Sequence, residues 1–72
     1  MTFVAGIDMG AKSTKAVILD GDKQICAKAT MKTRPDFHAV AREVLDAALQ
    51  QAGIKEKDVN YIATTGFGRY NV

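Results

Sequence analysis

The chain has 72 residues, of which 47% are hydrophobic and 25% are charged, and its formal net charge is +2. So small a charge, with basic residues scattered along the sequence, argues against a nucleic-acid partner. No apolar run approaches the ~20 residues of a membrane span, no basic-then-apolar leader is present, and one cysteine cannot form an internal disulfide, so we expect a cytoplasmic protein with no membrane partner.

The first predicted strand, at residues 2–7, is almost continuously apolar, and we expect it to be a central strand covered on both faces. A second apolar strand is predicted at residues 14–20. The loop between them is short and built from small and polar residues. An acid, Asp8, stands where the first strand ends, and Lys15 follows seven positions later. This pattern predicts a β-hairpin.

The composition of this loop favours the binding of phosphate. Gly10 permits a positive φ or a close backbone approach, and small side chains leave successive N–H groups open to an anion. Asp8 would hold Mg²⁺ through water and is the candidate catalytic residue, while Lys15 would place a positive charge beside a phosphate. A Walker A loop would run into a helix, whereas this one runs into a strand, and an ordinary hairpin with a solvated acid is the alternative. The candidate nucleotide-binding residues here are Gly10, Ala11, Lys12, Ser13, Thr14 and Lys15.

A hairpin turn signalled by Asp20 and Gly21 precedes the third predicted strand, at residues 24–32. This strand alternates between apolar and polar residues, which is typical of a half-exposed edge strand. Cys26 falls on its polar face, with no second cysteine and no histidine at ligand spacing, so we interpret it as a bystander thiol. The residues predicted to face the core are Ile25, Ala27, Ala29 and Met31.

One long helix is predicted at residues 36–52. Thr33 and Asp36 form a weak version of the capping box, Pro35 suits the first turn, and Gly53 ends the helix. His38 lies in the first turn, away from the core-facing stripe, and we interpret it as a solvated surface residue. The stripe consists of Phe37, Val40, Ala41, Val44, Ala48 and Ala52.

A polar connector leads to a fourth predicted strand at residues 59–65. Because a crossover through the helix precedes it, this strand should be parallel to its neighbour, which gives an α/β fold with the element order β-β-β-α-β and the sheet order 3-2-1-4. Asp8 and Gly66 would then lie at the carboxyl ends of neighbouring parallel strands, where ligands bind in open sheets. The later Gly66-to-Asn71 segment mimics a dinucleotide motif by chance, because no helix follows it.

The spacing D-x-G-x-x-x-x-K between two buried strands resembles the first phosphate loop of the actin, Hsp70 and sugar-kinase superfamily. Together with the Asp20-Gly21 turn and residues 63–69, Ala-Thr-Thr-Gly-Phe-Gly-Arg, it is similar to the BadF/BadG/BcrA/BcrD-type ATPases, which serve benzoyl-CoA reductase and 2-hydroxyacyl-CoA dehydratases. The resemblance implies that residues 1–72 are an N-terminal, truncated part of a ribonuclease H-like, actin-like ATPase domain.

The same resemblance implies a function for the longer protein. It would couple hydrolysis of ATP with Mg²⁺ to low-potential electron transfer, as a dimer with a bridging [4Fe–4S] cluster and a reductase or dehydratase as its partner. The cluster cysteines of the family lie beyond this chain, so no residue here is a cluster ligand. Gly66 matches a nucleotide-binding position, and the role of Arg69 in the family signature stays open.

Three other functions remain open. A sugar or acetate kinase of the same superfamily is one, and a non-catalytic fragment is another. The third, a ribonuclease H-like nuclease, would need a second carboxylate near Asp8. We expect the 72-residue chain alone to be inactive, to bind ATP more weakly than ~1 mM, and to associate through residues 59–65.

Overall fold

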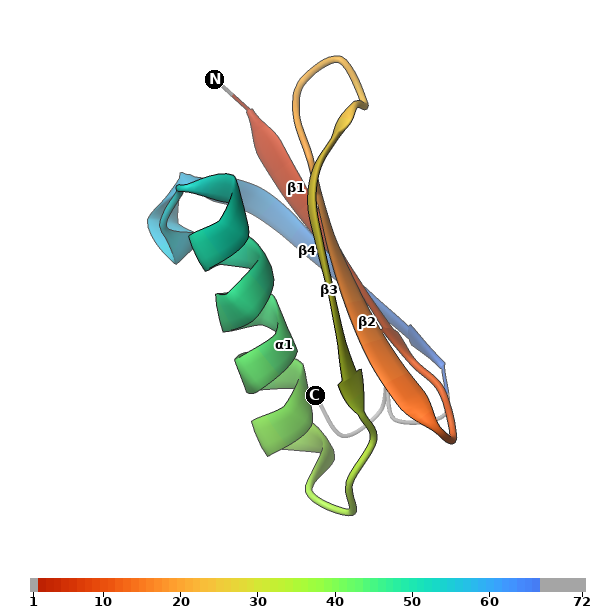
Figure 1. The fold of residues 1–72 in the computed structure, drawn as a ribbon. Helices are drawn as coiled ribbons and strands as arrows, with labels where there is room; N and C mark the ends of the chain where they lie inside the picture. Colours follow the sequence, from red (N-terminus) through yellow and green to blue (C-terminus); the bar gives the residue numbers. More distant parts are fainter. Residues whose placement is uncertain (1, 67–72) are drawn as a thin grey trace.

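The computed structural model of the chain describes residues 2–66, which form one four-stranded sheet with a long helix against one face (Figure 1). The three strands that come first in the chain are followed by the helix and then by a fourth strand, in the predicted order. A short 3₁₀ turn in the polar connector was not predicted. The elements are β1 (Phe3–Met9), β2 (Ser13–Leu19), β3 (Ile25–Lys32), α1 (Phe37–Ala52), η1 (Glu56–Asp58) and β4 (Val59–Gly66).

The strands lie in the order β3-β2-β1-β4, which confirms the predicted topology. β2 is antiparallel to both β1 and β3, whereas β4 is parallel to β1. The helix provides the crossover from β3 to β4, so β1 lies inside the sheet between β2 and β4 (Figure 1). As a result Asp8 pairs with Thr65 and Met9 with Gly66 at the carboxyl ends of the two parallel strands.

The hydrophobic core lies between α1 and the sheet face that the helix covers. Alternate residues of β1 and β2 point into it, as the period of two in a strand requires. The predicted helical stripe is confirmed at its centre, but Phe37 is only half-buried, and Leu45 and Leu49 are buried as well. The sheet contributes Ala5, Ile7, Met9, Ala16, Ile18 and Ala27, and the helix contributes Val40, Ala41, Val44, Leu45, Ala48 and Leu49.

The second face of the sheet has no covering layer within residues 2–66 (Figure 1). Val4 and Val17 are half-buried there, and Tyr61 is 65% exposed. The prediction that the first strand is covered on both faces is therefore wrong for the part of the chain that the structure describes. Neither helix in that part combines the length and the hydrophobicity needed to cross a bilayer.

The turn between β2 and β3 is at the predicted place but has a different geometry. Lys23, not Gly21, takes the left-handed conformation with φ 63°. The Asp20 carboxylate stabilises the turn by accepting from the amides of Asp22 and Gln24. A register shift follows, and it places Ile25 opposite Leu19, with Ile25 57% exposed. Ile25 is therefore not a core residue, because the extra residue in β3 turns it out of the alternation.

Both ends of α1 have side-chain or backbone caps. Asp36 is the N-cap and accepts from the Ala39 amide at 3.1 Å, so Thr33 has no part in a capping box. Gly53 ends the helix in the left-handed conformation with φ 75°, as predicted. Its amide and that of Ile54 both reach the Leu49 carbonyl, which satisfies the last turn.

Candidate functional site

The predicted acid and lysine lie side by side on the uncovered face of the sheet. Asp8 and Lys15 are register partners across the antiparallel β1–β2 pair. Residues that face each other in this way project to the same side of the sheet, with Cβ atoms about 5 Å apart. The helix-facing side is occupied by their buried neighbours Ile7, Met9 and Ala16, and both charged residues are exposed.

A shallow hollow of about 170 Å³ adjoins this pair. Gly6 contributes no side chain to it, and a Cβ built at Gly6 would meet no atom within 4 Å. Asp8, two residues further along β1, closes the hollow on the side toward the hairpin loop. The lining residues are Gly6, Ile7, Asp8, Val17 and Ala63.

The tip of the hairpin folds through a close approach of two backbone segments. The Gly10 amide donates to the Ser13 carbonyl at 3.0 Å, and a Cβ on Gly10 would lie 3.0 Å from that same oxygen. Gly10 is therefore needed for space and not for a positive φ, because Lys23 and Gly53 are the residues with positive φ in the described chain. Ala11 and Lys12 are exposed at the tip, which leaves their backbone open to a ligand.

One predicted binding residue turns its side chain away from this face. Thr14 is 0% exposed, and its hydroxyl lies 2.9 Å from the Thr33 hydroxyl on the helix side of the sheet. Its part in a phosphate site is limited to its backbone. Thr33 itself was missed as a site residue, because its partners are 19 and 23 positions away and nothing local marks it.

The carboxylate at this site suits Mg²⁺ held through water better than a metal held by a protein cage. Mg²⁺ keeps several waters and takes one or two carboxylates together with substrate phosphates. Asp8 is exposed at the end of β1, beside the hollow. Residues 2–66 contain no group of three metal-ligating side chains, and Cys26 is an exposed free thiol on β3.

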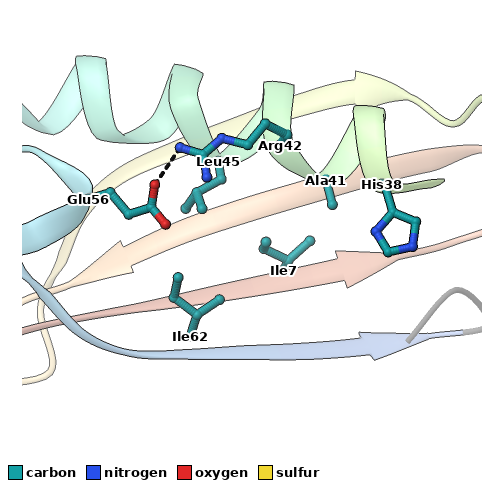
Figure 2. Close-up of a pocket in the computed structure, with 7 residues that line it drawn as sticks. All are labelled: Ile7, His38, Ala41, Arg42, Leu45, Glu56 and Ile62. Carbon is teal, nitrogen blue, oxygen red and sulfur yellow. Dashed lines mark hydrogen bonds and ion pairs between the residues drawn. The ribbon is translucent and has the colours of Figure 1, made fainter. Parts of the chain in front are cut away.

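A second hollow, of about 240 Å³, lies on the other face between α1 and β4 (Figure 2). Its walls are mostly apolar, with His38 at one end and an ion pair of Arg42 with Glu56 at the other. The two charges lower the pKa of Glu56 and raise that of Arg42, chiefly through their hydrogen bond. Because the hydrogen-bonding capacity of these charges is turned toward each other, this hollow offers less to a phosphate than the hairpin does.

Comparisons with known proteins agree with the sheet topology and the hairpin motif. The sequence profile of the BadF/BadG/BcrA/BcrD ATPase family matches residues 5–72. One of the subunits of benzoyl-CoA reductase from Thauera aromatica is 42% identical over 72 residues, which are 94% of this chain and 26% of that protein. Xylulose kinase of an Arthrobacter species is 34% identical over 68 residues, covering 94% of this chain and 71% of that one.

A solved structure with the same fold holds a nucleotide. The activator of the 2-hydroxyisocaproyl-CoA dehydratase from Clostridium difficile, with bound ADPNP, superposes with a TM-score of 0.86 and 27% identity, over 97% of this chain and 26% of that one. The chain thus spans about a quarter of the length of this activator and of the reductase protein. These matches confirm the resemblance noted in the sequence, and the chain belongs to the BadF/BadG/BcrA/BcrD ATPase family.

Proposed function

We propose that this chain forms one wall of an ATP-hydrolysing site in a longer protein, as part of an actin-like ATPase domain. The observation that carries the proposal is the pairing of Asp8 with Lys15 beside the Gly6 hollow, at the end of a central strand. Ligands bind at the carboxyl ends of strands in open α/β sheets, and this is the end where both residues lie.

Each residue has a separate role in this proposal. The backbone amides of the loop from Gly10 to Lys15 bind the phosphates, and the Lys15 ammonium sets a positive charge against them. Asp8 orients the attacking water and holds Mg²⁺ through water, and the ion, when bound, neutralises charge on the phosphates. Gly66, the register partner of Met9, brings the end of β4 alongside as a further nucleotide contact.

The use made of the hydrolysis follows from the relatives. Their names include a component of benzoyl-CoA reductase and an activator of a 2-hydroxyacyl-CoA dehydratase. We infer that the longer protein, as a dimer, couples ATP hydrolysis to transfer of a low-potential electron to such a partner enzyme. A bridging [4Fe–4S] cluster would carry the electron, and Cys26, exposed on β3, is not one of its ligands in this proposal.

Phosphoryl transfer to a sugar is the second candidate function. The similarity to xylulose kinase favours it, because the match extends over 94% of this chain. The hairpin serves both functions equally well, since it acts on the phosphates of ATP and not on the acceptor. The two differ in whether the terminal phosphate goes to water or to a sugar hydroxyl.

Turnover assays on the full-length protein test the proposal and separate the two candidates. We expect release of inorganic phosphate from Mg-ATP without any sugar, and faster release when the reduced protein meets its reductase or dehydratase partner. A requirement for a sugar would instead support the kinase. A full-length protein that neither binds nor hydrolyses Mg-ATP would overturn both.

A further inference from the structure

Thr33 makes three hydrogen bonds, all to the β1–β2 hairpin. It lies between β3 and α1, far from the hairpin in sequence but next to it in the fold. Its backbone amide donates to the Lys12 carbonyl at 3.0 Å, and its hydroxyl donates to the Gly10 carbonyl at 2.8 Å. The third bond joins its hydroxyl to that of Thr14 at 2.9 Å.

The hydroxyl bonds form a chain with a fixed direction. A hydroxyl has one proton to donate, and that of Thr33 goes to the Gly10 carbonyl. Thr14 must therefore donate to Thr33, and this bond satisfies a hydroxyl that is 0% exposed. The buried end of the chain holds Thr33 in place, and Thr33 in turn holds the loop.

Two peptide units of the loop are oriented by these contacts. In a trans peptide the C=O and the following N–H point in opposite directions. The Gly10 and Lys12 carbonyls both point to Thr33, so the amides of Ala11 and Ser13 point away from it. Thr33 thus sets the direction of two of the amides that the proposed phosphate site uses.

Helix capping does not account for these contacts. Asp36 is the residue that caps α1, with its carboxylate on the Ala39 amide. The Thr33 side chain is committed to the hairpin instead. Its contacts therefore act on the loop and not on the start of the helix.

We propose that Thr33 is a positioning residue, which holds the loop of the β1–β2 hairpin in the shape that presents the Ala11 and Ser13 amides to a nucleotide phosphate. The proposal rests on the function proposed above, because it assumes that the loop binds phosphate. Thr33 touches no phosphate itself and acts through the two carbonyls. A preorganised loop binds more tightly because it loses less conformational freedom on binding.

Three variants of the full-length protein isolate the hydroxyl. Thr33→Val removes the bond to Gly10 but keeps the size of the side chain and the amide bond to Lys12. Thr33→Ser keeps the hydroxyl. The double variant Thr14→Val with Thr33→Val also removes the buried hydroxyl that Thr33→Val would leave unpaired, so it remains informative if Thr33→Val fails to fold. Thr2→Val, at the opposite end of β1, controls for the same chemical change on the surface.

Two measurements separate the loop from the ligand. Hydrogen exchange of the peptide that contains Gly10 to Ser13 is followed without nucleotide, and the Kd of Mg-ADPNP is measured by calorimetry. We expect Thr33→Val and the double variant to exchange faster in this peptide and to raise the Kd about tenfold, while Thr33→Ser and Thr2→Val stay within about twofold of the parent.

The outcomes distinguish the two proposals. If the parent binds Mg-ADPNP and neither valine variant changes the exchange or the Kd, Thr33 has no positioning role and the proposed function stands. Faster exchange with an unchanged Kd would show that Thr33 orders the loop but that binding does not use that order, which also overturns the inference. A parent that does not bind nucleotide removes the proposed function and the ligand on which this inference rests.

Discussion

Asp8 and Lys15 are direct register partners across the β1–β2 pair, although seven positions separate them in the sequence. The hairpin brings an acid and a base to one face of the sheet, beside a hollow that the missing side chain of Gly6 leaves open. A triphosphate with its metal carries both signs of charge, so neighbouring groups of opposite sign can divide the phosphate and the metal between them.

The first prediction concerns Asp8 in the full-length protein. We expect Asp8→Asn to lower ATP turnover by ~10²-fold or more, because positioning and charge stabilisation at phosphoryl-transfer sites have effects of that size. The melting temperature should change little, since the side chain is exposed. Asp22→Asn, in the exposed β2–β3 turn, is the matched control. Turnover within twofold of the parent would remove Asp8 from the mechanism.

The second prediction concerns Lys15. A charge-assisted contact contributes about 1.5–3 kcal/mol, so Lys15→Ala should weaken Mg-ATP binding by about 10- to 100-fold. Calorimetry on the full-length protein measures this. Lys28→Ala is the control, because Lys28 is an exposed lysine on the neighbouring strand β3, opposite Val17. Equal affinities for the two variants would restore the ordinary hairpin as the interpretation of this loop.

The sequence was sufficient to predict the hairpin and the sheet because both depend on local patterns. Two apolar runs, a glycine loop and a single amphipathic helix permit few topologies once the crossover is right-handed. Thr33 could not be predicted, because its role arises from contacts with Gly10 and Thr14 that only the folded chain creates. The local signal at Thr33, a serine or threonine three residues before an acid, favoured a capping box that the structure does not contain.

The third prediction compares the same substitution at two glycines. Gly10→Ala should destabilise the fold by about 1 kcal/mol or more, because its Cβ would press on the Ser13 carbonyl 3.0 Å away. Gly6→Ala should leave stability unchanged or raise it by about 0.4–1 kcal/mol, since its Cβ meets nothing within 4 Å. Urea unfolding of both variants provides the test. A Gly10→Ala variant as stable as Gly6→Ala would contradict the close approach at the hairpin tip.

The fourth prediction concerns acid and the ion pair of Arg42 with Glu56, which joins α1 to η1. The pKa of Glu56 is lowered in the folded state, chiefly by its hydrogen bond to Arg42. The unfolded chain therefore binds a proton more readily at this site, so the stabilisation is present above the unfolded pKa and is lost as pH falls through the folded pKa.

Melting temperatures between pH 7 and pH 3 measure this effect. Arg42→Gln should flatten the fall in stability at acid pH, whereas Lys57→Gln, an exposed cation in the same turn, should not. The contribution is small because the pair is exposed, and about 1 M salt should screen it. An unchanged acid profile in Arg42→Gln would show that the pair does not stabilise the fold.

Predictions about faces of the sheet were less successful than predictions about its order. A continuously apolar strand indicates that two faces need cover, but it does not say which segment supplies the second layer. The face that bears Asp8 has no covering layer in residues 2–66. Ile25 was assigned to the core because strict alternation was assumed, and a one-residue register shift beside Leu19 was enough to expose it.

The fifth prediction concerns the exposed edge of β4. The two edges of the sheet differ, because β3 carries Lys28 and Lys32 whereas β4 has no charged residue. Lysines on an edge strand oppose pairing with another chain, and an uncharged edge invites it. Tyr61 is 65% exposed and Ile62 is 39% exposed on β4, so apolar contact adds to the free backbone groups of this edge. We therefore expect the 72-residue chain to self-associate through β4.

Sedimentation velocity over a series of concentrations tests this expectation with two matched variants. Tyr61→Lys should raise the dissociation constant about tenfold or more, since it places a charge on the pairing edge. Ile25→Lys adds the same charge in place of a residue that is 57% exposed, but on the strand at the opposite edge of the sheet. If the two variants reduce association equally, the chains meet through general apolar contact and not through β4, and a monomeric parent at all concentrations would show that the edge is not adhesive.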